Sequence, residues 1–237
     1  MEIAGELARL GAPAGATVLA SSQSSGRGRT GRAWTAPPGS SILMSFIAYP
    51  LRDRTELGAL SLLFGLAVAD TVGTFGAGPT AIKWPNDVLV NGRKIAGILV
   101  TTRVRQGCRR PTLITGIGLN VNTQASDLPE QATSIAIEAG PQPLDEVLVV
   151  LCGLLTSTLR LFDQGAEEEL RRRLEAQLAY KDEMVTIEDG LTTVTGLFRG
   201  VAANGALILE SATGEFVRVV AGDLTRGPRP LGLPPAT

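Results

Sequence analysis

Arginine and glycine alternate in a polar stretch near the start of the chain. The stretch from Ser21 to Trp34 holds three arginines, three glycines and no acidic residue. Glycine lets a backbone approach an anion closely, and arginine supplies forked donors that suit phosphate oxygens. Trp34 offers a flat face for a purine or an anchor for the loop itself. Strands expected at 17–20 and 42–48 enclose the stretch, which favours a phosphate-binding loop over a disordered basic tail.

A second polar cluster flanks Asn91-Gly92, the strongest hairpin signal in the chain. The run Lys-Trp-Pro-Asn-Asp at 83–87 precedes this turn, and Arg93 and Lys94 follow it. The turn would fold both cations back toward the amide and the carboxylate that end the run, around one cleft. A carboxylate beside an amide could hold Mg²⁺ together with phosphate oxygens. A salt-bridged hairpin with solvated charges fits the pattern equally well.

A third segment, 116–122, places two glycines inside a strand that is expected at 113–121. Gly116 and Gly118 suggest the close approach of a ligand or of another backbone, because a strand interior otherwise disfavours glycine. Asn120 could donate a hydrogen bond to a phosphate. Taken alone, this segment is more typical of tight strand packing.

Composition excludes several classes of protein. The 237 residues include 22 basic and 23 acidic ones, and a net charge of −1 does not suit a general nucleic-acid or membrane-surface binder. The chain contains no histidine, which excludes Ser-His-Asp triads and histidine-ligated metals. The two cysteines, Cys108 and Cys152, lie in unlike contexts and suit a reducing compartment. We therefore expect a cytoplasmic protein with no DNA or membrane partner.

The hydrophobic pattern places these segments in an α+β fold. It predicts helices at 1–10, 55–74, 144–162 and 166–179, the second of them N-capped by Thr55. It predicts strands at 17–20, 42–48, 81–84, 88–90, 94–100 and 113–121. Shorter strands follow at 184–187, 192–199, 206–210 and 216–220, separated by turn dipeptides, as in a small barrel. We expect domains at 1–180 and 181–227, followed by a disordered tail at 228–237.

In their order and spacing, the three polar segments resemble the catalytic domain of biotin protein ligases. The family's Gly-Arg-Gly-Arg-x-Gly-Arg-x-Trp loop matches 26–34, and its Lys-Trp-Pro-Asn-Asp and Lys-x-Ala-Gly-Ile runs match 83–87 and 94–98. Its Gly-x-Gly-x-Asn-x strand matches 116–121, and the Ala-Thr-Ser-Ile run at 132–135 resembles its Ala-Thr-Ser-Leu. The resemblance implies an α+β fold: a mixed β-sheet with helices, of the class II aminoacyl-tRNA synthetase-like type, and a small C-terminal SH3-like β-barrel.

The resemblance also implies an ATP-dependent reaction in two steps. The carboxylate of biotin would attack the α-phosphorus of ATP, giving biotinyl-5′-AMP and pyrophosphate, with Mg²⁺ accompanying the nucleotide. A lysine of a biotin carboxyl-carrier domain would then attack the mixed anhydride and release AMP. Both steps build or relocate negative charge, so fixed cations suffice and histidine is not required.

The resemblance gives individual residues their expected roles. The central electrostatic position, beside the biotin carboxylate and the α-phosphate, falls to Lys94, and the expected catalytic residues are Lys94, Arg29 and Lys83. The residues expected to contact biotin are Gln23, Gly26, Arg27, Gly28, Arg29, Lys94 and Gly97. The residues expected to contact ATP are Arg29, Arg32, Trp34, Lys83, Asn86, Asp87, Asn120 and Arg226. Asp87 is also the expected Mg²⁺ ligand.

Two departures from the family pattern bear on function. Many relatives carry an N-terminal helix-turn-helix that represses biotin genes, and this chain has no room for one, so it resembles the non-regulatory class. Relatives usually place a strand ending in Ser-Thr-Asn before the first helix, where this chain begins. Either the start is misassigned or truncated, or part of the biotin pocket is missing. Three functions stay open: an active ligase, a non-catalytic biotin or adenylate binder, and a ligase for a related acid such as lipoate. The sequence is also compatible with a homodimer.

Overall fold

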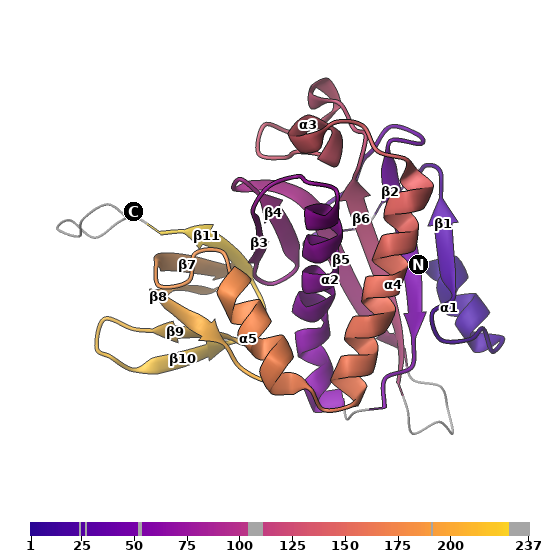
Figure 1. The fold of residues 1–237 in the computed structure, drawn as a ribbon. Coiled ribbons are helices and arrows are strands. Elements are labelled where there is room, and N and C mark those ends of the chain that lie inside the picture. The colour runs from indigo at the N-terminus through magenta and orange to yellow at the C-terminus, as the bar shows by residue number, and fades with distance from the viewer. Residues whose placement is uncertain (24, 27, 52–53, 104–110, 191, 228–237) are drawn as a thin grey trace.

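Two antiparallel sheets organise the chain in the computed structural model, which describes residues 1–237 apart from 24, 27, 52–53, 104–110, 191 and 228–237 (Figure 1). The large sheet has the strand order β1-β2-β6-β5-β4-β3. Its strands are β1 (Thr17–Ala20), β2 (Ser41–Ala48), β3 (Thr80–Lys83), β4 (Asp87–Val90), β5 (Arg93–Arg103) and β6 (Thr112–Asn120). The small sheet has the order β10-β9-β8-β7-β11. Its strands are β7 (Met184–Asp189), β8 (Thr192–Val201), β9 (Leu207–Glu210), β10 (Phe216–Val219) and β11 (Asp223–Arg226).

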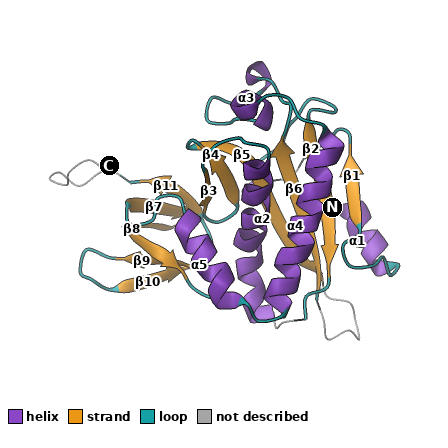
Figure 2. Ribbon diagram, in the orientation of Figure 1, coloured by secondary structure: helices purple, strands orange, loops and turns teal. Residues whose placement is uncertain are grey.

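Helices cover the two faces of the large sheet unequally. One face carries α2 (Leu60–Thr74) and α4 (Leu144–Asp163), with α5 (Glu167–Gln177) beside α2 (Figures 1 and 2). The opposite face carries only the short α1 (Glu2–Arg9), whose Ala4 and Ala8 pack on Ile47 and Ile114. A fifth helix, α3 (Ile135–Ala139), lies at one end of the sheet (Figure 1). The rest of the second face is therefore free to form a site.

Strand β2 shows why this arrangement suits the sequence. All eight of its residues are buried, because α2 and α4 cover one side and α1 and the loops cover the other. A strand covered on both faces has a continuous apolar run rather than alternating polarity. This explains why the run from Ile42 to Ala48 is apolar except for Ser45.

Helix α2 is apolar on all sides. The window Leu57–Thr74 is long and apolar enough to cross a membrane by length and composition, but 67% of it is buried inside the fold. A helix that packs against a sheet on one side and against α4 and α5 on others has this composition. We therefore interpret it as a core helix.

The start of α2 differs from the prediction. The helix begins at Leu60, after a 3-10 segment at Arg54–Ala59, so the predicted start at Thr55 is wrong. The reason is a long-range contact. A Cβ on Gly58 would lie 2.2 Å from the carbonyl oxygen of Asn204, in the turn between β8 and β9. The chain before α2 is thus shaped by the small sheet, which local sequence does not reveal.

Most other predicted elements are confirmed. The α+β class holds, although every ladder in the large sheet is antiparallel and parallel pairing is limited to the isolated bridges Ile82–Leu178 and Lys94–Ala132. The Asn91-Gly92 hairpin forms with positive φ angles of 49° and 77°, as a tight turn of this kind requires. The predicted disordered tail and Cys108 lie outside the described residues.

Candidate active site

A cleft of about 850 Å³ opens on the face of the large sheet that α2 and α4 leave uncovered. Residues of β2, β5 and β6 form its floor, and the 21–34 loop, the β3–β4 turn and the start of β11 form its walls. The predicted site residues that line it are Gln23, Gly28, Arg29, Arg32, Trp34, Lys83, Asn86, Asp87, Lys94 and Gly97. The structure therefore brings together segments that are far apart in sequence.

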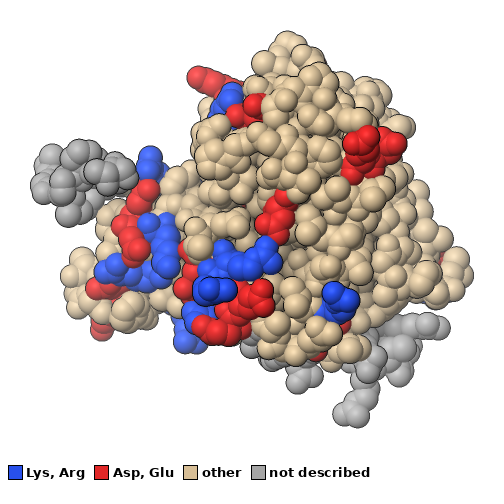
Figure 3. Space-filling view, in the orientation of Figure 1, with Lys and Arg blue, Asp and Glu red and all other residues tan. Residues whose placement is uncertain are grey.

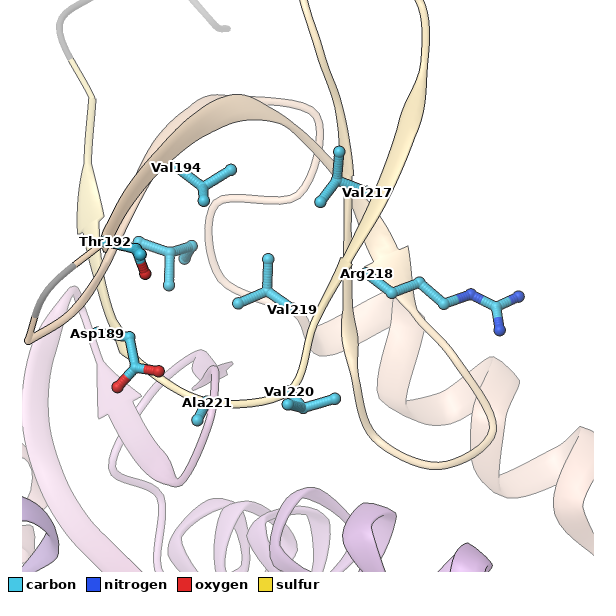
Figure 4. A pocket seen from close by; sticks show the side chains of 9 residues that line it. Asp189, Thr192, Val194, Val217, Arg218, Val219, Val220 and Ala221 are labelled. Atoms are coloured by element: carbon cyan, nitrogen blue, oxygen red, sulfur yellow. The ribbon is translucent and has the colours of Figure 1, made fainter.

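A second hollow, of about 220 Å³, lies within the small sheet and is lined mainly by apolar residues (Figure 4). The side chain of Arg218 points away from it, and none of the predicted site residues lines it (Figure 4). Charged side chains gather over α5 and the small sheet (Figure 3). Ion pairs within these elements include Arg171–Glu168 and Arg199–Glu210. We therefore take the large cleft as the candidate site.

Glycines make the floor of the cleft shallow. A Cβ on Gly118 would lie 2.5 Å from Cε2 of Trp34, and one on Gly97 would lie 3.3 Å from Cζ3 of the same ring. A Cβ on Gly116 would lie 2.8 Å from the sulfur of Met1. The strand is closely approached by the side chains of Trp34 and Met1, not by the ligand or the second backbone that the sequence suggested.

The β4–β5 hairpin brings Lys94 and Asp87 together. The ammonium Nζ of Lys94 lies 2.7 Å from Oδ1 of Asp87 and 5.6 Å from the centroid of the Trp34 ring. The Lys94 side chain is 37% exposed, so its charge is held in place yet open to the cleft. A carboxylate on one side and an aromatic face on the other fix the direction of this cation.

Asn86 and Trp84 hold the base of the hairpin. The side-chain amide of Asn86 donates to the carbonyl oxygen of Ile98 at 2.9 Å, and the backbone N–H of Ile98 donates to the carbonyl oxygen of Asn86 at 2.9 Å. Trp84 is buried, and its indole N–H donates to the carbonyl oxygen of Gly205 at 3.0 Å. The segment that carries the site is thus bound to both sheets.

The 21–34 loop is held mainly by its own backbone. The N–H of Gly28 donates to the carbonyl oxygen of Arg32 at 2.7 Å, and the N–H of Trp34 donates to that of Gly26 at 3.1 Å. Nη1 of Arg29 is buried and has no hydrogen-bond partner in the described part of the structure. A guanidinium with one buried, unused donor is suited to an anion that enters the cleft.

Arg32 is engaged by the small sheet. Its guanidinium forms an ion pair with the carboxylate of Asp223, at the start of β11. Asp223 itself lines the cleft. The loop and the small sheet therefore meet at the rim of the site, and their contact is an exposed charge pair.

The chemistry available is electrostatic. Lys94, Arg29 and Lys83 supply positive charge around one cleft, and the glycine floor carries the ring of Trp34. Among the residues that the structure describes, no group of three or more His, Cys, Asp or Glu could hold a metal ion. The arrangement suits an anionic substrate whose charge grows during reaction.

Comparison with known proteins identifies the family. The family description "Biotin/lipoate A/B protein ligase family" matches residues 5–122, and "Biotin protein ligase C terminal domain" matches residues 182–224. The biotin--[acetyl-CoA-carboxylase] ligase of Mycobacterium tuberculosis is 33% identical over 216 residues, covering 89% of this chain and 78% of that protein. The bifunctional ligase/repressor BirA of Bacillus subtilis is 32% identical over 233 residues, covering 94% and 69%. The chain belongs to the biotin protein ligase family.

A solved relative agrees in fold. The structure of biotin protein ligase from Aquifex aeolicus in complex with biotin and ATP has a TM-score of 0.76 and 27% identity to this chain. The match covers 91% of this chain and 90% of that one, so it extends over both sheets. The biotin protein ligase fold predicted from the sequence, with its small C-terminal β-domain, is therefore confirmed.

Three predicted residues of this biotin protein ligase do not line the cleft. Asn120 is buried, and its amide donates to the carbonyl oxygen of Thr133 at 3.0 Å. Arg226 donates to Glu183 at 2.8 Å and lies 5.5 Å from the ring centroid of Tyr180. The hydrogen bonds that Arg226 donates to the Glu183 carboxylate raise the pKa of the Arg226 guanidinium. Gly26 packs against another part of its own loop, where a Cβ would lie 2.1 Å from the carbonyl oxygen of Trp34. Both Asn120 and Arg226 have structural partners here, and their contact with ATP stays a prediction.

Other predictions are untested. Arg27 lies outside the described residues. Asp87 as a Mg²⁺ ligand stays a prediction, and its Oδ1 is paired with Lys94, which is a poor arrangement for a cation site. Sequence reasoning did not single out Asp223 or Glu138. The first begins β11, and the second follows the Ala-Thr-Ser-Ile run by three residues.

Proposed function

We propose that this protein is an ATP-dependent biotin ligase that forms biotinyl-5′-AMP and then transfers biotin to a lysine of a carboxyl-carrier domain. In the first step, a biotin carboxylate oxygen bonds to the α-phosphorus of ATP, and the bond to the bridging oxygen breaks, so pyrophosphate leaves. In the second, the neutral carrier amine attacks the acyl carbon, AMP leaves with the electron pair, and the amine loses a proton.

The position of the Lys94 ammonium is the observation that best supports this proposal. The attacking carboxylate and the triphosphate are both anions, so their approach costs electrostatic energy unless a cation lies between them. Lys94 is held at the cleft by Asp87 at 2.7 Å and by the Trp34 face, so the site has little reorganisation to undergo as charge develops. A fixed cation of this kind stabilises the transition state more than the separated reactants.

The remaining cations have supporting roles. Arg29, with its unused donor, binds the triphosphate, and Lys83 stabilises the departing pyrophosphate. Gln23, Gly28 and Gly97, which line the cleft, contact biotin in this proposal. Magnesium enters with the nucleotide, and no step here depends on Asp87 as its ligand. The same proposal includes a carboxyl-carrier domain as the partner and a cytoplasmic location. It also places the boundary between the two domains at residues 180 and 181.

The test is a coupled assay on the full chain. Purified protein is incubated with biotin, MgATP and an isolated carrier domain, and pyrophosphate, biotinyl-5′-AMP and biotinylated carrier are each measured. The proposal requires all three products. Biotin binding by calorimetry without pyrophosphate release would instead identify a non-catalytic binder. Faster turnover with lipoate than with biotin would identify a ligase for that acid.

A further inference from the structure

Lys94 is held in place by a segment that the proposed chemistry does not use. Its backbone N–H donates to the carbonyl oxygen of Gln131 at 2.8 Å, and its own carbonyl oxygen accepts from the N–H of Thr133 at 2.8 Å. These two bonds form the isolated parallel bridge between Lys94 and Ala132. The backbone of the 131–133 segment therefore fixes the position of the Lys94 Cα.

Glu138, on α3, ties this segment to the tip of the hairpin. Its Oε1 accepts from Nη2 of Arg93 at 2.7 Å and from Oγ1 of Thr133 at 2.6 Å, and its Oε2 accepts from Nδ2 of Asn91 at 2.9 Å. Its side chain is only 8% exposed. The three donors come from both sides of Lys94: two from the β4–β5 hairpin and one from the segment that binds its backbone.

The helix that carries Glu138 is itself anchored. Oγ of Ser134 accepts from the N–H of Ile137 at 3.2 Å as the N-cap of α3, and it donates to the carbonyl oxygen of Thr123 at 2.7 Å. Thr133 and Ser134 are fully buried. A carboxylate on such a base is a fixed point for the hairpin rather than a mobile surface group.

We propose that Glu138 is a positioning residue for Lys94, which it sets above the glycine floor by holding the hairpin tip to the 131–133 segment. This inference rests on the proposed function. A carboxylate is suited to the position because it accepts several hydrogen bonds and offers no donor that would compete with Arg93 or Asn91. Glutamine keeps one acceptor oxygen but turns the other into a donor, so it supports only part of the clamp.

The kinetic test compares Glu138→Ala and Glu138→Gln with a matched control, Asp70→Asn. Asp70 pairs with Arg173 between α2 and α5, away from the cleft. Misplacing a catalytic group by about an ångström costs roughly 100-fold in rate, so kcat for adenylate formation should fall by up to that factor in Glu138→Ala. KM for biotin and ATP should change much less, Glu138→Gln should be intermediate, and Asp70→Asn should keep the wild-type kcat.

A second readout does not depend on activity. The chain has only three lysines, so protein labelled with ¹³C-lysine gives few side-chain signals, and the Lys94 signal is assigned by its loss in Lys94→Arg. The ring of Trp34, 5.6 Å from Nζ, displaces this signal from those of Lys83 and Lys181. We expect Glu138→Ala to move the Lys94 signal and Asp70→Asn to leave it in place.

The outcomes separate the two proposals. If wild-type protein forms no adenylate, the proposed function fails, and the Lys94 signal still decides the positioning role. If folded Glu138→Ala and Glu138→Gln keep both the wild-type Lys94 signal and the wild-type kcat, the positioning role is overturned. If Glu138→Ala does not fold, Arg93→Ala removes one of the three donors and should shift the Lys94 signal in the same direction.

Discussion

The β4–β5 hairpin and the 21–34 loop meet at the same cleft but are held in opposite ways. In the hairpin, Lys94 already has its carboxylate partner, Asn86 is bonded to Ile98, and Trp84 is bonded to Gly205. In the loop, the described hydrogen bonds are largely internal, and Nη1 of Arg29 has no partner among the described residues. The hairpin is therefore preorganised, and we expect the loop to acquire further partners from a ligand.

The largest effect is expected for the preorganised lysine. Lys94→Ala should lower the rate of adenylate formation by roughly 10²–10³-fold, because removing one fixed electrostatic contact to a transition state costs about that much. The fold should persist, since the side chain is partly exposed. Pyrophosphate release under saturating biotin and ATP measures the effect. Lys181→Ala is the control, because Lys181 pairs weakly with Glu175 at 3.8 Å and does not line the cleft. Near-normal activity in Lys94→Ala would remove the basis of the proposed mechanism.

Replacing Arg29, in the loop, should lower the activity of the protein without lowering its stability. Arg29→Ala is expected to slow adenylate formation by roughly 10–100-fold, since charge-assisted contacts to phosphate are worth about 1.5–3 kcal/mol. The midpoint of unfolding should stay unchanged because Nη1 of Arg29 has no hydrogen bond to lose in the described fold. Steady-state kinetics and chemical denaturation are measured on the same samples, with Arg218→Ala as the control. A clear drop in stability would show that the loop is a structural element like the hairpin.

The two tryptophans of the chain allow the stability of the two regions to be compared directly. Trp34 ends the loop, and Trp84 lies at the base of the hairpin. Trp84→Phe removes the hydrogen bond to Gly205 and leaves a partly buried carbonyl oxygen without that donor. The free energy of unfolding should fall by about 1–3 kcal/mol. Trp34→Phe removes an indole N–H that has no partner in the described structure, so it should cost less. Urea unfolding followed by circular dichroism compares them, and an equal loss in both variants would contradict the distinction between the regions.

The hairpin was also the region that sequence reasoning predicted best. The Asn91-Gly92 turn has a local signal, and the run at 83–87 can only be folded back onto Lys94 by that turn. Strand alternation likewise puts Gly116 and Gly118 on one face of β6. These features follow from residues that are near one another in the chain.

Contacts between segments far apart in the chain account for the site features that the sequence did not predict. Alternation places Asn120 on the same face as Gly118, but the carbonyl of Thr133 takes its donor, and only the tertiary fold brings the 131–134 segment there. Arg226 meets Glu183 and Tyr180 because β11 pairs with β7, a pairing between distant segments. Glu138 went unnoticed for the same reason, since its three donors are gathered by the fold.

The smallest effect is expected where the loop touches the small sheet. The ion pair of Arg32 with Asp223 is largely exposed, and exposed pairs stabilise by about 0–1 kcal/mol, so Asp223→Asn should scarcely change the midpoint of unfolding. The substitution Asp223→Asn should instead change how readily the 21–34 loop is cleaved by a protease. We expect trypsin to cleave after Arg29 or Arg32 faster in Asp223→Asn than in wild type, and biotin plus ATP to protect both proteins equally.

This last experiment distinguishes two ways of holding the loop. If ligand phosphates replace Asp223 as the partner of the arginines, protection by biotin plus ATP cannot depend on the Asp223 carboxylate. The control is Glu210→Gln, which removes a partner of Arg199 on the same sheet and does not line the cleft. Cleavage is followed by mass spectrometry of the fragments. Loss of ligand protection in Asp223→Asn would mean that the small sheet holds the loop closed directly, and the loop would then resemble the hairpin in being fixed by the protein rather than by the substrate.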